Sequence, residues 1–159
     1  MRRKRVLRVT TVPISLVTLL KGQLEFFQDM HFEILAVSAG GWGADKLKDS
    51  GINHKTILLT RKITPVHDVI ALVQLVFIIL KFKPSIVHTH TPKAGLLGMI
   101  AAWICRVPVR MHTVAGLPWM ESSGPLRVLL KWMERLTVFF ATRVYPNSNN
   151  LLQYLKGEL

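Results

Sequence analysis

The sequence predicts an α/β fold, a Rossmann-like parallel sheet with helices on both faces. Runs rich in β-branched residues alternate along the 159-residue chain with longer segments of helical period, as in repeated strand–helix units. The strand-like runs show little alternation of apolar and polar residues, which is typical of strands covered on both faces. Several runs end abruptly in His, Thr, Pro or Gly, and ligands bind at such strand ends in parallel sheets.

The first half of the chain alternates strands with helices. The first strand stops at Pro13, and apolar residues from Leu16 to Phe27 then recur at helical spacing. The turn Gly40-Gly41-Trp42-Gly43 opens a short helix that ends near Gly51. In order, we expect a strand at 6–12, a helix at 14–29, a strand at 32–38, the short helix, a strand at 54–60 and a long apolar helix at 66–82.

The second half repeats the pattern. Thr91-Pro92 separates a strand from an apolar helix, and a later amphipathic helix is followed directly by a short strand. Residues 1–148 are therefore expected to form one Rossmann-like domain, and the helical pattern at 149–159 suggests that the natural protein continues. The expected elements are strands at 85–91, 109–113 and 143–146, and helices at 93–106, 125–142 and 149–159.

The charge is strongly basic and unevenly distributed. Lys and Arg number 21 against nine Asp and Glu, a net charge of +12, and no acidic residue occurs between Val69 and Met120. Such a field attracts phosphorylated ligands, an anionic membrane surface or nucleic acid, although generic solvation is the plain alternative. Because no nucleic-acid-binding motif accompanies the charge, we do not expect nucleic acid as a partner.

The apolar content is high, with 50% hydrophobic residues and a mean hydropathy of +0.32. The longest apolar stretches, 69–80 and 94–105, have 12 residues each, whereas a membrane-spanning helix needs about 20, so we expect buried core helices. The basic N-terminus precedes a strand pattern and not a signal peptide. The single cysteine, Cys105, fits a buried structural thiol in a reducing compartment, and a cytoplasmic location follows.

The segment Thr91-Pro92-Lys93-Ala94-Gly95 is a candidate anion-binding site. Thr91 can cap the helix and Pro92 suits its first turn. Lys93 would then lie beside a helix N-terminus, which attracts anions. Gly95 and Gly98 would let the backbone approach a ligand closely, or would only allow the helix to pack tightly on the sheet.

Histidines end two neighbouring strands. His88 and His90 share one face of a strand, and His112 ends the next strand, followed by Thr113 and Gly116. A histidine in an apolar strand is usually a satisfied core residue, but His112 lies at the ligand-binding edge, which favours a functional role. Because no third ligand has metal-binding spacing, we expect no metal site.

The sequence lacks the common cofactor motifs. No Gly-x-Gly-x-x-Gly follows the first strand, and no Walker loop or Asp-x-Asp pair occurs. Gly40-Gly41-Trp42-Gly43 follows the second strand with a different spacing, so we interpret it as a turn and expect no cofactor. Ser15 is expected as the N-cap of the first helix and as a further substrate-binding residue.

At these residues the chain resembles a known family. The stretches His90-Thr91-Pro92-Lys93-Ala94-Gly95 and His112-Thr113-Val114-Ala115-Gly116-Leu117-Pro118 carry the resemblance most specifically. The chain resembles the N-terminal half of bacterial family-four glycosyltransferases of the GT-B architecture, the glycosyl transferases group 1, which build capsule, exopolysaccharide and lipopolysaccharide sugars. Supporting segments lie in family order at 10–16, 21–24, 36–38, 60–65 and 144–148.

The resemblance implies two facing Rossmann-like domains. This N-terminal domain would bind the acceptor, a missing C-terminal domain would bind the nucleotide-sugar, and the sugar would move between them without a metal. His112 occupies the position of a histidine that reaches the donor sugar, so it is the candidate catalytic residue. The loop Val12-Pro13-Ile14-Ser15 departs from the glycine-rich form of relatives. Because both walls of the cleft are needed for transfer, the chain alone is expected to be inactive.

The acceptor in this family is commonly a polyprenyl-diphosphate-linked saccharide. The resemblance therefore implies a peripheral protein on the inner face of the cytoplasmic membrane, where each basic residue near anionic lipid contributes about 1 kcal/mol. Trp119, Met120 and Trp132 would lie at that interface or, equally, in the core. The basic candidates are Arg127, Lys131 and Arg135, with Arg2, Arg3, Lys4 and Arg5 at the N-terminus.

Two other functions stay open at this stage. The chain could be a non-catalytic membrane-docking subunit of a split glycosyltransferase, and a natural stop near residue 159 would favour this alternative. It could also be a stand-alone anion- or nucleotide-binding α/β module. Tight binding of a free nucleotide-sugar by this chain would favour the module.

Overall fold

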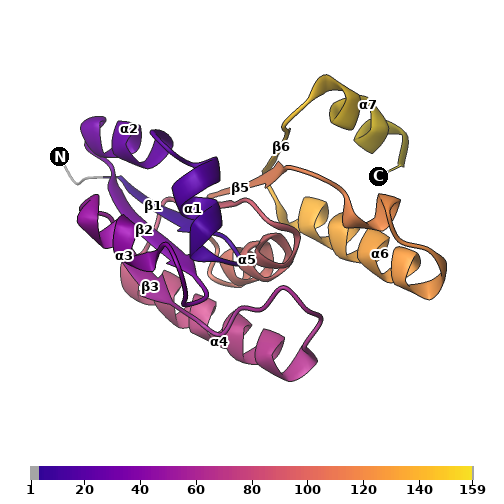
Figure 1. Cartoon of the computed structure of the whole chain (residues 1–159), viewed down its shortest axis with the longest axis horizontal. Helices are drawn as coiled ribbons and strands as arrows, with labels where there is room; N and C mark the ends of the chain where they lie inside the picture. Colours follow the sequence, from indigo (N-terminus) through magenta and orange to yellow (C-terminus); the bar gives the residue numbers. More distant parts are fainter. Residues whose placement is uncertain (1–3, 159) are drawn as a thin grey trace.

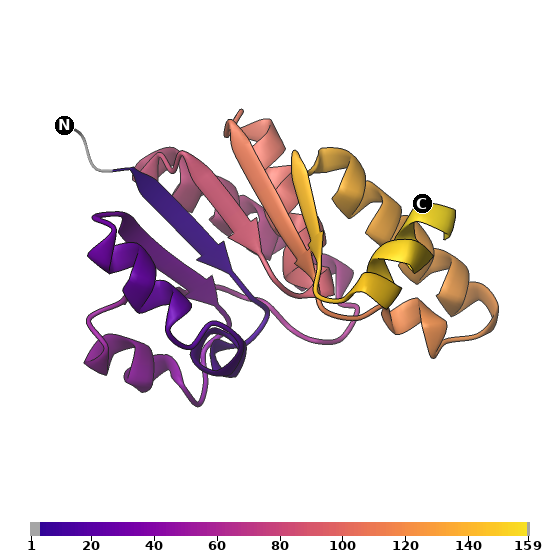
Figure 2. The ribbon, with the colours of Figure 1, turned by 90° about the horizontal axis from the view of Figure 1, so that it is seen from above.

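The computed structural model describes residues 4–158, and six parallel strands form its central sheet. The strand order is β3-β2-β1-β4-β5-β6, and every neighbouring pair is parallel, as Figure 2 shows. The order reverses between β1 and β4, which confirms the predicted Rossmann-like fold. The strands are β1 (Arg5–Val9), β2 (Glu33–Ser38), β3 (Asn53–Thr56), β4 (Ile86–Thr89), β5 (Val109–Val114) and β6 (Arg143–Pro146).

Helices cover both faces of the sheet, as the sequence predicts (Figure 1). On one face, α1 (Pro13–Leu19), α2 (Gln23–Asp29) and α3 (Ala44–Asp49) pack against Ile34 and Ala36 of β2. The other face carries α4, α5 and α6, with α5 in contact with both of its neighbours. These helices are α4 (Pro65–Phe82), α5 (Pro92–Ile104) and α6 (Gly124–Phe140). The short helix η1 (Pro118–Met120) precedes α6 and lies beside it, and α7 (Asn149–Glu158) lies beside β6.

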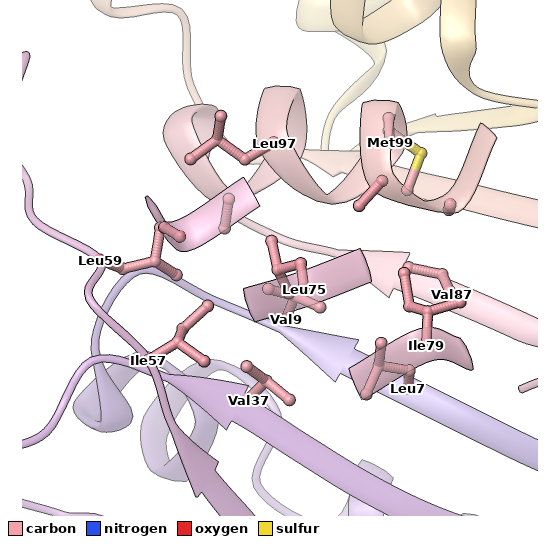
Figure 3. Close-up of a cluster of buried hydrophobic side chains, with 14 of the residues drawn as sticks. Leu7, Val9, Val37, Ile57, Leu59, Leu75, Ile79, Val87, Leu97 and Met99 are labelled. Carbon is pink, nitrogen blue, oxygen red and sulfur yellow. The ribbon is translucent and has the colours of Figure 1, made fainter. Parts of the chain in front are cut away.

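The largest hydrophobic cluster lies between the sheet and helices α4 and α5 (Figure 3). Its strand residues all point to the same face, because residues two apart in a strand share a face. This packing fixes the carboxyl ends of β1 and β4 relative to the start of α5. The labelled members include Leu7, Val9, Val37 and Val87 from the strands, Leu75 and Ile79 from α4, and Leu97 and Met99 from α5.

The chain between β1 and β2 forms two helices where the sequence predicts one at 14–29. Gly22 has a φ of 76°, a left-handed conformation that interrupts the helix before α2 begins. The predicted third strand is also shorter, because β3 ends at Thr56 and residues 57–60 continue without strand pairing.

Helix α4 is present at its predicted position, but only one side of it is buried. Ala71, Leu75 and Ile79 face the core, whereas Val69 and Phe77 are 62% and 67% exposed. The prediction of a buried core helix is therefore wrong for its outer side. Cys105 is half-buried at the end of α5.

Candidate functional site

The loops that follow β1, β3 and β4 meet at the carboxyl edge of the sheet and line a cavity of about 340 Å³. Three of the predicted binding residues, Ser15, Thr91 and Lys93, line this cavity together. Thr11 and Arg61 add further polar groups. The apolar lining comes from Val12, Ile63, Pro92, Pro118, Leu130 and Met133.

Hydroxyl groups join the loops after β1 and β4. The Thr11 backbone N–H donates to Oγ1 of Thr91 at 3.0 Å, and the two Oγ1 atoms lie 2.7 Å apart. Thr91 occupies the N-cap position of α5, but its side chain makes no capping bond. The predicted capping role is therefore wrong, because the hydroxyl bonds Thr11 across the cavity wall instead.

Ser15 is not the N-cap of the first helix either. The helix begins at Pro13 with Val12 at the N-cap, so Ser15 lies one turn inside it. Its side chain is buried and lines the cavity. Its expected capping role is wrong, and its expected substrate contact stays a prediction.

Lys93 is buried, and its ammonium group forms an ion pair within the protein. Its Nζ atom lies 2.7 Å from Oδ1 of Asp68 on α4. It also donates to the hydroxyls of Thr60 and Thr64 and to the carbonyl oxygen of Lys62. The ammonium thus ties the start of α5 to the loop before α4, and its anion-binding role stays a prediction.

Arg61, which the sequence analysis did not select, is the exposed cation at this cavity. It also lines an adjoining hollow of about 330 Å³ together with Gly40, Gly41 and Trp42. Arg61 forms no ion pair among residues 4–158. Its place in the 60–65 segment that supports the family resemblance is the one sequence signal that pointed to it.

His88 and His90 do share one face, and Arg8 lies between them. The Arg8 guanidinium donates from one nitrogen to Nδ1 of His88 at 2.7 Å and to Nε2 of His90 at 2.8 Å. His88 Nε2 then donates to the Thr113 hydroxyl at 2.8 Å. Burial, with Arg8 and other charges nearby, lowers the pKa of His88 to about 3 and of His90 to about 2, so both rings are neutral at neutral pH. This arrangement is an internal network around a buried arginine.

His112 lies on the opposite face of the sheet and is 2% exposed. Its Nδ1 atom lies 2.7 Å from the Thr89 hydroxyl, and its Nε2 atom lies 3.9 Å from Oε1 of Glu134 on α6. Burial lowers the pKa of His112 to about 4 and raises that of Glu134 to about 7. The ring therefore lies beneath the helices as a neutral group, and its contact with a donor sugar stays a prediction.

The predicted binding residues Gly95, Thr113 and Gly116 have different surroundings in the structure. A Cβ atom on Gly95 would lie 2.5 Å from the His112 ring, and one on Gly98 would lie 2.6 Å from Thr89. Tight helix-on-sheet packing therefore explains both glycines. Gly116 is exposed with open space around it, and Thr113 is half-buried beside His88.

The basic residues of α6 lie over tryptophan rings. Arg127 and Lys131 lie 5.9 and 5.3 Å from the Trp119 ring centre, and Arg135 lies 5.7 Å from that of Trp132. Trp119 is fully buried, so the core alternative holds for it, whereas Trp132 and Met120 are 56% and 50% exposed. At the N-terminus, Arg5 pairs with Glu33, Lys4 is exposed, and Arg2 and Arg3 lie outside the described residues.

Among residues 4–158, no group of three or more His, Cys, Asp or Glu side chains is placed to hold a metal ion. Transfer without a metal stays a prediction about the chemistry. The cavity is lined by hydroxyls, apolar side chains, the exposed Arg61 guanidinium and Lys93, whose ammonium is paired with Asp68. This lining suits binding of a polar or anionic ligand.

Comparison with known proteins gives two close sequence relatives. A family model described as "Glycosyl transferase 4-like domain" matches residues 28–157. The capsular polysaccharide biosynthesis glycosyltransferase CapM of Staphylococcus aureus is 34% identical over 151 residues, which cover 95% of this chain and 39% of that protein. A UDP-Gal:alpha-D-GlcNAc-diphosphoundecaprenol alpha-1,3-galactosyltransferase of Escherichia coli is 30% identical over 146 residues, 86% of this chain and 38% of that protein. The chain thus spans about two fifths of the length of these relatives.

Solved structures share the fold at lower identity. MurG of Acinetobacter baumannii superposes with a TM-score of 0.68 at 17% identity, over 93% of this chain and 42% of that protein. UDP-N-acetylglucosamine 2-epimerase of Rickettsia bellii superposes with a TM-score of 0.72 at 19% identity, over 99% and 42%. These likenesses show the fold alone, the Rossmann-like sheet found in GT-B proteins.

Proposed function

Because the chain belongs to the glycosyl transferase 4-like family, we propose that it is the acceptor-binding domain of a glycosyltransferase of surface polysaccharide synthesis. The enzyme transfers a sugar from a nucleotide-sugar to a membrane-linked saccharide on the inner face of the cytoplasmic membrane. The donor binds to a second domain, for which the remaining length of the relatives leaves room. The reaction uses no cofactor or metal, and this chain alone is inactive.

The composition of the cavity at the carboxyl edge carries the proposal. Its lining combines the threonines Thr11 and Thr91 with apolar side chains, and the exposed Arg61 lines both the cavity and the adjoining hollow. A lipid-linked saccharide diphosphate has the matching parts, namely hydroxyls, an apolar chain and two negative phosphates. Arg61 suits the diphosphate, because a guanidinium can donate two parallel hydrogen bonds to phosphate oxygens.

The loop that carries Arg61 is held in place by Lys93. Lys93 bonds Thr60, Lys62 and Thr64 on either side of Arg61. The arginine is therefore presented from an anchored loop, which lowers the entropy cost of binding. In this proposal Lys93 positions the anion-binding residue and does not contact the anion itself.

The test is sugar transfer by the full-length enzyme to a polyprenyl-diphosphate-linked acceptor. We expect Arg61→Gln to raise KM for the acceptor about tenfold or more, because a hydrogen bond to a charged group contributes about 1.5–3 kcal/mol. Lys62→Gln is the matched control, since Lys62 is exposed, adjacent and not part of the cavity lining. Equal acceptor KM values for the two variants would contradict the role of Arg61, and no transfer to any lipid-linked saccharide would contradict the function.

A further inference from the structure

Trp42 lies on the loop between β2 and α3 and is the most exposed of the four tryptophans. It is 67% exposed, whereas Trp119 is fully buried. Gly41 and Gly43, on either side of Trp42, have φ angles of 132° and 99°, in the left-handed region that favours glycine. A large aromatic ring thus stands outside the core, on a loop shaped by two glycines.

The loop that carries Trp42 is held against its neighbours. A Cβ atom on Gly43 would lie 3.4 Å from the backbone nitrogen of Ile14 on α1. The backbone N–H of Ala39 donates to the carbonyl oxygen of Thr11, in the loop after β1, at 3.1 Å. The indole is therefore presented from an anchored backbone, which lowers the entropy cost of binding a ligand.

Trp42 borders two hollows. The adjoining hollow of about 330 Å³ is the one that Arg61 also lines. The other, of about 650 Å³, is lined by residues of α1, α2 and α3, among them Lys46. The Lys46 Nζ atom lies 4.7 Å from the centre of the indole ring, and Lys46 does not line the adjoining hollow. The side of the indole that borders the adjoining hollow is therefore not covered by this cation.

The adjoining hollow combines groups that bind a pyranose ring. The negative face of an indole attracts the polarised C–H groups on the apolar face of a sugar. The exposed backbone N–H groups of Gly41 and Trp42 donate to no acceptor among residues 4–158, so they are available to sugar hydroxyls. The volume lies at the small end of the range for ligand sites, about 300–1,000 Å³, which suits a small saccharide.

Arg61 connects this hollow to the cavity at the carboxyl edge, because it lines both. The proposed function assigns the acceptor diphosphate to Arg61. In a lipid-linked saccharide diphosphate, the first sugar is bonded directly to the diphosphate. A diphosphate held by Arg61 therefore brings that sugar to Trp42, while the apolar lining of the cavity contacts the start of the lipid chain.

We propose that Trp42 is a stacking platform for the acceptor saccharide, and that the adjoining hollow is the subsite of the sugar bonded to the diphosphate. The inference rests on the proposed function, because Arg61 must hold the diphosphate. Trp42 makes the chain select lipid diphosphates that carry a sugar over lipid diphosphates that carry none. The selection is made in binding, so it can be measured without sugar transfer.

The experiment measures binding of the full chain, by titration calorimetry, to farnesyl diphosphate and to farnesyl diphosphates that carry one N-acetylglucosamine, glucose or galactose. We expect at least one sugar-bearing probe to bind about fivefold more tightly than farnesyl diphosphate, the gain from one aromatic contact. Trp42→Leu should remove this advantage and leave the affinity for farnesyl diphosphate unchanged, whereas Trp42→Phe should keep part of it. Trp103→Ala removes another half-exposed indole, at the far end of α5, and as the matched control should keep all of it.

Arg61→Gln separates this inference from the proposed function. It should weaken binding of every probe by the same factor, because all of them carry the diphosphate. Binding that depends on Arg61 but shows no sugar advantage, or an advantage that survives Trp42→Leu, would overturn the inference and leave the proposed function standing. Absence of binding by every probe would overturn both.

Nuclear magnetic resonance reports the stacking contact directly. Protons above an aromatic ring shift upfield, so the ring protons of the bound sugar should shift upfield with the native chain and not with Trp42→Leu. Uridine diphosphate is the competing probe, because a nucleobase also stacks on aromatic side chains. Binding of uridine diphosphate that depends on Trp42 as strongly would overturn the proposal in favour of a nucleotide site.

Discussion

The Nζ atom of Lys93 lies 2.7 Å from Oδ1 of Asp68, and this ion pair joins the first turn of α5 to the first turn of α4. The two side chains are 9% and 20% exposed, so water screens the pair only in part. Lys93 also bonds the loop that carries Arg61. The pair therefore connects the packing of the helical layer to the geometry of the cavity.

Removal of one partner should destabilise the chain. We expect Lys93→Met to lower the free energy of unfolding by about 3 kcal/mol, because it leaves the Asp68 carboxylate without its cation in a mostly buried place. The measurement is urea unfolding at neutral pH. The double variant Lys93→Met with Asp68→Leu should recover much of the loss, and equal losses in the single and double variants would contradict the coupling.

An exposed pair provides the control for that measurement. Lys48 and Asp45 lie 3.6 Å apart on α3, with side chains 67% and 92% exposed. Lys48→Met should change stability by less than about 0.5 kcal/mol, since exposed ion pairs contribute little. A loss as large as that from Lys93→Met would mean that burial does not explain the difference.

The sequence predicted the sheet and its carboxyl edge well because strand and helix periods are local properties. His88 and His90 were correctly placed on one face by the two-residue period of a strand. Their partner Arg8 precedes His88 by 80 residues in the sequence. No local sequence pattern shows that β1 pairs with β4. For the same reason the sequence does not show that Asp68 pairs with Lys93, and Lys93 was therefore predicted to bind an anion.

The side chains at the strand ends were the hardest to place. The sequence predicts that His112 ends its strand, but β5 continues to Val114, so His112 lies within it. Its ring faces α5 and α6, because it occupies the face shared with Thr89. Arg61 was not selected, since an arginine in a polar loop has no periodic signal. The cap expected at Ser15 was also wrong, because the N-cap of α1 is Val12, three residues earlier, which places Ser15 inside the helix.

Gly95→Ala should destabilise the chain by about 1–3 kcal/mol. The new methyl carbon would lie 2.5 Å from Cε1 of His112, and overpacking of this kind outweighs the gain of about 1 kcal/mol in helix propensity. Thermal or urea unfolding measures the change. Gly157→Ala on α7 is the control and should not destabilise, because nothing lies within 4 Å of its Cβ position.

Stability should fall as the pH falls below about 6.5. Burial lowers the pKa values of His88, His90 and His112 to about 3, 2 and 4, from 6.5 in the unfolded chain. The unfolded state then binds more protons, so this stabilisation is complete above pH 6.5 and is lost as the pH falls toward the folded values. Between pH 6 and pH 5 the three histidines together lose about 3.5 kcal/mol of stabilisation, and Glu134, whose pKa is raised, offsets about 1 kcal/mol, so we expect a net loss of about 2 kcal/mol in urea unfolding. A flat profile in this window would contradict the neutral, buried histidines.

Glu134 contributes a pH dependence of stability that is opposite in sign to that of the histidines, and the Glu134→Gln variant tests it. Burial raises the pKa of Glu134 from 4.5 to about 7, so its folded state binds the proton more tightly than the unfolded state. The native chain thus loses stability from this group as the pH rises from 4.5 to 7. The glutamine variant should gain about 2 kcal/mol relative to the native chain between pH 5 and pH 8. Glu121→Gln, at an exposed position, is the control for the removal of one carboxylate.

His112→Ala should lower the free energy of unfolding by about 2 kcal/mol, because it opens a cavity and leaves the Thr89 hydroxyl without its ring partner. The catalytic role that the family resemblance implies for His112 requires, in addition, a loss of kcat that unfolding does not explain. The full-length enzyme, kept at a temperature where the variant is fully folded, would then have to lose about a hundredfold or more in kcat. A loss of transfer that only follows the folded fraction would instead assign His112 to packing, as its 2% exposure and its contact with Gly95 indicate. His112→Gln separates the two further, since it fills much of the cavity yet cannot act as an imidazole.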